Sequence, residues 1–440
     1  MVSPQIRTGR SGQRATGAPP RRRRLVIAAI CTALGLLLTA CSSGTPAAPA
    51  GGGASPFSSA SNTSGLRLEI TPGGGSTHAD PGHGITVTAA HGKITNVTVR
   101  TSGDAVTGAL SAAGTVWTST WALAVSQSYT VTATATGVTG QKVTQTSSFR
   151  TLTPSQTFQT MIFEGYQQTY GVAMPIILTF SQPVADKAAV ERSLELRTSK
   201  PVAGAWYWDG NQTLNFRPES YWPAHTQVSF TGHLNGVEVA PGVYGSHTLT
   251  QSFNIGDSLI VVASTSSHYM KLYRNGTLLH RWPISTGKPG DNTPNGTYVT
   301  IEKGNPVLMK GPGYSLEVPW SVRFTFSGDY LHDAYWSVGE QGFTNVSHGC
   351  VNMPPADAEA YYQMAVPGDP VTITGSPRAG VWDNGWTEWF LSWQKYLKGS
   401  ALHMAVQAGP GGSTFVNPAN LPAPATAPLG GPEQGNWAAA

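Results

Sequence analysis

Apolar and polar residues alternate with a period of two along most of this chain. Residues 85–101 (ITVTAAHGKITNVTVRT) and 128–137 (SYTVTATATG) show the alternation, and 258–264 (SLIVVAS) is a short apolar run. Gly- and Ser-rich turns separate such segments. Because this pattern is typical of β-strands with one or both faces buried, the chain is predicted to be mainly β.

Two consecutive segments show this alternation of apolar and polar residues with Gly- and Ser-rich turns. Between residues 66 and 153, strands recur at roughly 8 to 12 residues, which predicts an immunoglobulin-like β-sandwich. Residues 154–256 predict a second such domain, with a hairpin that turns at Asp209-Gly210. Neither segment clusters His, Cys or carboxylate residues, so we interpret both as rigid spacers.

A third, β-rich domain is expected over residues 257–376. It contains a strong hairpin signal at Asn275-Gly276. A short helix is predicted after the Pro pair in 354–365 (PPADAEAYYQMA), and 370–374 (PVTIT) is expected to close the domain as a strand.

The remaining residues divide into two parts. In 377–408, five aromatic residues stand at offsets 0, 4, 7, 11 and 14, which predicts one face of a helix. We expect this Trp-rich helical extension to pack onto the preceding domain rather than to bind carbohydrate. Gly, Pro and Ala dominate 409–440, which predicts a disordered tail. The aromatic residues are Trp382, Trp386, Trp389, Trp393 and Tyr396.

Residues 1–40 carry seven arginines and no acidic residue, followed by an apolar stretch, the order of a signal peptide. Leu38-Thr39-Ala40-Cys41 resembles the bacterial lipobox, which implies that Cys41 is diacylated and becomes the mature N-terminus. Two acyl chains would anchor the protein to the extracytoplasmic face of the cell membrane, with 41–65 as a flexible tether. Ordinary secretion, and Sec or twin-arginine export, stay open.

The formal charge of +4 falls to 4 − 7 = −3 without the seven N-terminal arginines. A remainder of that charge lacks the basic surface that nucleic acid requires, so that class of partner is excluded. The eleven histidines are scattered, and no His and carboxylate pair shows helical ligand spacing, so we expect no metal site and no cofactor.

Of the three cysteines, only Cys350 is expected to remain as a free thiol. Cys31 leaves with the signal peptide and Cys41 is expected to carry lipid, so Cys350 has no partner for an internal disulfide. In an oxidising envelope a lone thiol is either buried and inert or chemically active.

A nucleophilic Cys350 needs a base and a site for an oxyanion. His348 lies two residues before it, and His332 ends an apolar strand 18 residues upstream; either could be the base. Gly349 would let the backbone turn sharply and bring amides toward the carbonyl under attack, while Asn352 could donate to substrate.

The segments STGKPGDNTPNGTYV (285–299), His332 and SHGCVN (347–352) together resemble the signature of the YkuD-type L,D-transpeptidases of bacterial walls. The plan over residues 66–408 also resembles actinobacterial lipoprotein members with two immunoglobulin-like domains. The resemblance implies that Cys350 forms a thioester with a donor tetrapeptide stem, releases D-alanine and transfers the acyl group to a side-chain amine of an acceptor stem. It also implies susceptibility to carbapenems.

The resemblance implies roles for further residues. His332 would be the general base, and amides around His348, Gly349 and Cys350 would hold the oxyanion. The expected substrate contacts are Asn352, Ser327, Gly328, Tyr314, Ser347 and Trp336, the last as a pocket wall.

Two departures from the family pattern concern Asp333 and the expected lid. Asp333 follows the base; its carboxylate either raises the pKa of the imidazole or points to solvent, and we favour solvent. The segment NPVLMKGPGYSLEVPW (305–320) offers Met309 and Tyr314 as lid residues, but it is shorter than in relatives.

Other functions stay open. An L,D-carboxypeptidase would use water as acceptor, and a protein amine is a third possible acceptor. A non-catalytic wall-binding lipoprotein would leave the His and Cys residues unexplained. A sortase-like enzyme needs an Arg near the thiol, whereas the first Arg after Cys350 is Arg378. We expect a monomer that acts on peptidoglycan stem peptides.

Overall fold

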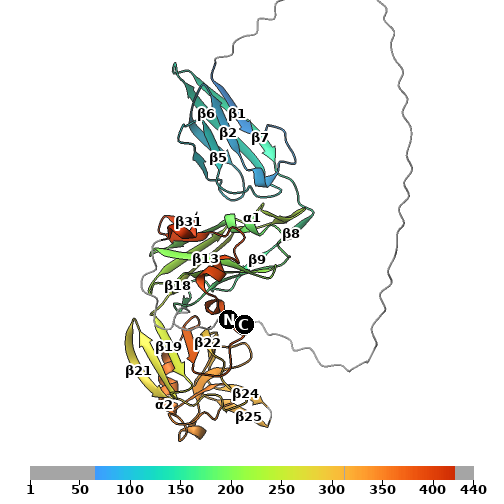
Figure 1. Cartoon of the computed structure of the whole chain (residues 1–440). Helices are drawn as coiled ribbons and strands as arrows, with labels where there is room; N and C mark the ends of the chain where they lie inside the picture. The colour runs from blue at the N-terminus through green and yellow to red at the C-terminus, as the bar shows by residue number, and fades with distance from the viewer. Residues whose placement is uncertain (1–64, 312, 422–440) are drawn as a thin grey trace, which may run out of the picture. The chain divides into compact units, whose positions relative to one another are not determined.

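The computed structural model describes residues 65–311 and 313–421 (Figure 1). The expected signal peptide, Cys41, the tether up to residue 64 and residues 422–440 lie outside the described residues. Within the described ranges, no helix combines the length and apolar character needed to cross a membrane. The described chain is mainly β with few helices, which confirms the predicted fold class.

The first domain is a pair of sheets around an apolar core. One sheet has the order β1-β2-β5-β4 and the other the order β3-β6-β7. His91, with a φ of +60°, separates β2 from β3, where the chain leaves one sheet for the other. Val87 and Val131 are fully buried. The elements are β1 (Arg67–Thr71), η1 (Pro81–His83), β2 (Thr86–Ala90), β3 (Gly92–Arg100), β4 (Gly108–Leu110), β5 (Val116–Ser119), β6 (Ser128–Gly137) and β7 (Lys142–Arg150).

The next region contains a ten-stranded sheet and a three-stranded sheet, β16-β17-β8. Asp209 of β13 pairs with Thr213 of β14, and Gly210 has a φ of +68°, so the hairpin predicted there is confirmed. The elements are β8 (Gln156–Phe158), β9 (Thr160–Ile162), β10 (Thr169–Tyr170), β11 (Ile176–Phe180), α1 (Lys187–Arg192), β12 (Leu194–Thr198), β13 (Val202–Asp209), β14 (Thr213–Pro218), β15 (Gln227–Gly232), β16 (Glu238–Ala240), β17 (Val243–Gly245) and β18 (Leu249–Ile255).

The large sheet is completed by the C-terminal part of the chain. β30 (Ala405–Gly409) lies between β12 and β13, and β31 (Gly412–Val416) pairs with β30. The short helix η4 (Pro418–Asn420) follows. The prediction of disorder from residue 409 is therefore wrong up to residue 421. Small buried residues at 405, 406 and 408 fill a gap between two strands, and backbone pairing supplies order that the low apolar content concealed.

The Trp-rich extension is not one helix, so that prediction is wrong. It forms η3 (Glu388–Phe390) and α3 (Trp393–Leu397), and the backbone at Leu391 between them is extended. Trp389 is fully buried, and its indole N–H donates to the carbonyl of Ala173 over 2.8 Å. The guanidinium of the buried Arg217 lies 4.6 Å from the Trp389 ring. The aromatic residues are thus packed, as expected. Trp389, however, joins the core of the large sheet and not that of the preceding domain, residues 257–376.

The region 257–376 is built from two sheets, β21-β20-β19-β29-β22 and β23-β26-β27-β28, with a separate hairpin β24-β25. Asn275-Gly276 forms the predicted turn with both φ angles positive, and the predicted helix is α2. The elements are β19 (Leu259–Ser264), β20 (Tyr269–Arg274), β21 (Thr277–Pro283), β22 (Gly296–Val299), β23 (Glu302–Gly304), β24 (Val307–Gly311), β25 (Tyr314–Val318), β26 (Ser321–Arg323), β27 (Tyr330–Asp333), η2 (Tyr335–Ser337), β28 (Val351–Met353), α2 (Pro355–Met364) and β29 (Pro370–Thr374).

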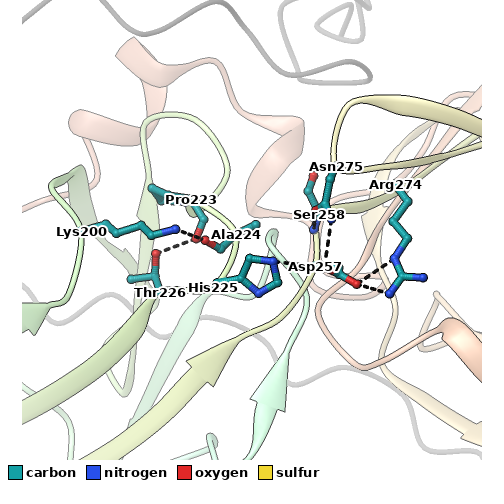
Figure 2. Close-up of polar contacts among 9 residues, drawn as sticks. All are labelled: Lys200, Pro223, Ala224, His225, Thr226, Asp257, Ser258, Arg274 and Asn275. Carbon is teal, nitrogen blue, oxygen red and sulfur yellow. Dashed lines mark hydrogen bonds and ion pairs between the residues drawn. The ribbon is translucent and has the colours of Figure 1, made fainter.

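Polar contacts join the segment that follows β18, and His225 in the loop before β15, to the β20–β21 turn (Figure 2). The carboxylate of Asp257 accepts from Arg274 and from the Asn275 amide, the latter over 3.0 Å, and it lies 3.2 Å from the ring of His225. The Asn275 and Arg274 hydrogen bonds lower the pKa of Asp257. Asp257 therefore fixes the start of β19 against the β20–β21 turn.

The buried indole of the extension leads to the first prediction. Trp389→Ala should destabilise the described fold by about 3–5 kcal/mol, because it leaves a cavity and an unpaired carbonyl. Trp336→Ala, which removes an indole that is 45% exposed, should change stability by less than about 0.5 kcal/mol. Calorimetry of both variants measures the difference, and equal losses would contradict the packing described.

Candidate active site

The parallel pairing of β27 with β28 brings the main candidate residues together. His332 stands in register with Asn352, and Cys350 lies two residues before Asn352. All three line one cavity of about 380 Å³. The described residues around it are Met309, Tyr314, Leu316, Val318, His332, Trp336, Ser337, Glu340, Val346, Ser347, His348, Cys350 and Asn352. The sheet thus brings together His332 and Cys350, which lie 18 positions apart in the sequence.

His332 is held as a neutral imidazole. Its side chain is buried, and Nδ1 lies 2.7 Å from the carbonyl oxygen of Asp333. A carbonyl only accepts hydrogen bonds, so Nδ1 carries the proton and the lone pair of Nε2 is free. Burial lowers the pKa of His332 to about 4. His332 is therefore an unprotonated base at neutral pH.

The side chain of Asp333 is 5% exposed, so the expectation that it points to solvent is wrong. Burial raises the pKa of its carboxyl group. The contact with His332 is made by the backbone carbonyl and not by the carboxylate. Asp333 orients the base through an atom that any residue at this position would supply.

The thiol of Cys350 is held in its protonated form. Burial raises its pKa to about 12, and the carboxylate of Asp329 adds to the effect. The sulfur lies 3.8 Å from the carbonyl oxygen of Gly328, which can accept a weak S–H hydrogen bond. A thiol in this state needs a base that removes its proton as it attacks.

Gly349 occupies a position where a side chain would be strained. Its φ is +130°, and a Cβ there would lie 2.5 Å from a carboxylate oxygen of Asp329. Its amide donates to the hydroxyl of Ser347 over 3.2 Å, and that hydroxyl donates to the Cys350 carbonyl over 2.6 Å. In the described chain the amides of His348 and Cys350 donate to no protein acceptor, so these two are free to hold an oxyanion.

His348 is poorly suited to act as the base. The ammonium of Lys288 lies 2.9 Å from its Nε2 and donates to it. The ring also stacks on Tyr314, with centroids 5.4 Å apart. Of the two candidate bases, the geometry favours His332.

The other expected substrate contacts differ in their surroundings. The amide of Asn352 is buried and donates to the Ser337 hydroxyl over 2.9 Å. Ser327 and Gly328 do not line the cavity. Ser327 exchanges two hydrogen bonds with the side chain of Asn384, over 2.8 and 3.0 Å. Direct contact of Ser327 and Gly328 with substrate stays a prediction.

The β24–β25 hairpin supplies one apolar side of the cavity. Tyr314, Leu316 and Val318 alternate along β25, and Met309 pairs with Leu316 across the hairpin. Sequence reasoning missed Leu316 and Val318, although their spacing of two from Tyr314 is a usable signal. Trp336 lines the cavity as expected and stacks on His332, with centroids 5.9 Å apart.

Two regions of the chain match known protein families, and most of its length matches known relatives. Residues 258–373 match the L,D-transpeptidase catalytic domain and residues 76–238 the bacterial Ig domain. L,D-transpeptidase 2 of Mycobacterium tuberculosis is 32% identical over 331 residues, which cover 72% of this chain and 80% of that protein. L,D-transpeptidase 5 of the same organism is 34% identical over 348 residues, 76% of this chain and 77% of that protein.

A solved structure of LD transpeptidase LdtMt1 in complex with imipenem is 36% identical to this protein. The match covers 50% of this protein and 100% of the LdtMt1 chain, with a TM-score of 0.43. The chain belongs to the L,D-transpeptidase family, as the two mycobacterial relatives show. The resemblance stated from the sequence is confirmed. Across the described ranges, no three His, Cys, Asp or Glu side chains are grouped so as to hold a metal ion.

The carboxylate beside the thiol leads to the second prediction. Asp329→Asn removes a negative charge that disfavours the thiolate, so the pKa of Cys350 should fall. Alkylation by iodoacetamide at pH 8 should accelerate severalfold, because a larger fraction of Cys350 is then thiolate. Asn keeps an acceptor oxygen for the Thr325 hydroxyl, which now donates to Asp329 over 2.9 Å.

The matched control is Asp357→Asn, which removes the same charge from α2, outside the cavity. It should leave the alkylation rate unchanged. Equal rates for wild type and Asp329→Asn would show that the Asp329 charge does not act on the thiol.

Proposed function

We propose that the chain is a cysteine acyltransferase that cross-links peptidoglycan stem peptides through a thioester on Cys350. Its membership of the L,D-transpeptidase family supports the reaction class. The observation that carries the assignment of residues is the β27–β28 register, which places a neutral His332 and the thiol on one cavity.

In the first step the thiol proton passes to Nε2 of His332 while the sulfur attacks the carbonyl carbon of the third residue of a donor tetrapeptide. The amides of His348 and Cys350 hold the oxyanion of the tetrahedral intermediate. His332 then gives its proton to the leaving nitrogen, D-alanine departs, and a thioester remains.

In the second step the side-chain amine of the third residue of another stem attacks the thioester. A nitrogen–carbon bond forms and the carbon–sulfur bond breaks; His332 takes the proton that the nitrogen loses and returns it to the Cys350 sulfur, which restores the thiol. An L,D-carboxypeptidase would use water in this step. The anchoring of the enzyme by lipid on Cys41, at the extracytoplasmic face of the membrane, is part of this proposal and places Cys350 on the side of its substrate.

Covalent labelling tests the nucleophile. Intact mass after exposure to a carbapenem should show one adduct on the wild-type protein and none on Cys350→Ala. Cys350→Ala should also make neither cross-linked dimer nor tripeptide from disaccharide tetrapeptide. An adduct that persists after the substitution would remove Cys350 as the nucleophile.

The pH dependence tests the base. Because His332 is neutral above a pKa of about 4, the acid limb of the acylation rate should lie well below the ordinary histidine range. His332→Gln should slow acylation by roughly 10²- to 10⁴-fold. His348→Gln should keep the acid limb at the same pH, and a limb that moves in this variant would instead identify His348 as the base.

A further inference from the structure

We propose that Glu340 and Trp336 form a binding site for the ammonium group of the acceptor stem, and that this site selects an amine over water as the acceptor. The inference rests on the proposed function and extends it to the residues that choose between cross-linking and hydrolysis. Sequence reasoning assigned no role to Glu340.

The residues that line the cavity differ in charge from those behind them, where Lys288 contacts His348 and Asp329 acts on Cys350. Among the described residues that line it, Glu340 is the only carboxylate, and there is no Lys or Arg. The side chain of Glu340 is exposed, and no hydrogen bond or ion pair joins it to any other described residue. A cationic group that enters the cavity therefore finds one carboxylate that is not already neutralised by the protein.

The backbone that carries this carboxylate is fixed. The amide of Glu340 donates to the Ser337 carbonyl over 3.2 Å, and its own carbonyl accepts from Phe343 and Thr344 over 3.0 and 2.8 Å. The neighbouring Gln341 is buried and donates to the Ala334 carbonyl over 3.1 Å. The charge stands on a hydrogen-bonded turn, so an ammonium that binds there pays little to order the loop.

Trp336 supplies the second part of the site. It precedes Glu340 by four residues, lines the same cavity and is 45% exposed. An indole face attracts ammonium groups, and a carboxylate that lines the same cavity can add an ion pair. Trp336 also stacks on the imidazole of His332, so an ammonium held on its ring lies close to the base that must take its proton.

The chemistry of the second step explains why such a site matters. The acceptor arrives as an ammonium and loses one proton to solvent before its nitrogen can attack the thioester. The nitrogen loses a second proton as the amide forms; His332 takes that proton on Nε2 and returns it to the departing sulfur. Water carries no charge and gains nothing from Glu340. On the β24–β25 side of the cavity, Met309, Leu316 and Val318 are apolar, and the ring of Tyr314 is stacked on His348, so this side offers an ammonium no carboxylate.

The test is the partition of the thioester between two products. With disaccharide tetrapeptide as both donor and acceptor, Glu340→Gln should lower the ratio of cross-linked dimer to tripeptide about two- to fivefold, the range of an exposed charge contact. Added NaCl should lower this ratio more in the wild type than in the variant, because salt screens only the charged residue. Glu340→Asp should retain part of the preference.

Controls separate this inference from the proposed function. Glu359→Gln removes an equivalent exposed charge from α2 and should leave the ratio unchanged. Intact mass should show the same rate of Cys350 thioester formation in wild type and Glu340→Gln. A normal thioester with an unchanged ratio would overturn the Glu340 site alone. Slower thioester formation in Glu340→Gln with an unchanged product ratio would also overturn the Glu340 site, since Glu340 would then contact the donor. If the wild-type protein formed no thioester, both the Glu340 site and the proposed function would be overturned.

Discussion

The parallel register between β27 and β28 is the constraint on which the site depends. It fixes His332 opposite Asn352, with Cys350 at the entrance to β28. A slip of one residue would turn the imidazole to the other face of the sheet. The register also closes the intervening chain into a loop, and that loop supplies Trp336 and Glu340 to the same cavity. One strand pairing therefore positions the nucleophile, the base and a cavity wall.

Burial sets the resting state of the two reacting groups. With a pKa of about 4 for His332 and about 12 for Cys350, the neutral imidazole and neutral thiol are strongly favoured over the ion pair. A thiol that is almost wholly protonated reacts slowly with oxidants, which would suit the extracytoplasmic location that we propose. The reactivity must then arise when a carbonyl occupies the cavity, because proton transfer to His332 and attack by sulfur can proceed together.

The sequence predicted features whose signals are local. The Asn275-Gly276 turn and helix α2 need only adjacent residues, and the motif around Cys350 identified the family. The insertion of β30 was hidden because its partners β12 and β13 lie about 200 residues earlier and its side chains are small. Glu340 carries no motif, and its meaning comes from the cavity. The burial of Asp333 depends on tertiary packing that no local pattern reports.

The interpretation of residues 154–256 as a rigid spacer is incomplete, because this domain also holds the extension that reaches the active-site loop. Trp389 enters the core of the large sheet and donates to Ala173. A few residues earlier, Asn384 exchanges hydrogen bonds with Ser327. The same loop continues to the Gly328 carbonyl beside the thiol. A continuous set of contacts thus runs from the sheet to the nucleophile, so the loop that faces the thiol is supported by a domain without catalytic residues of its own.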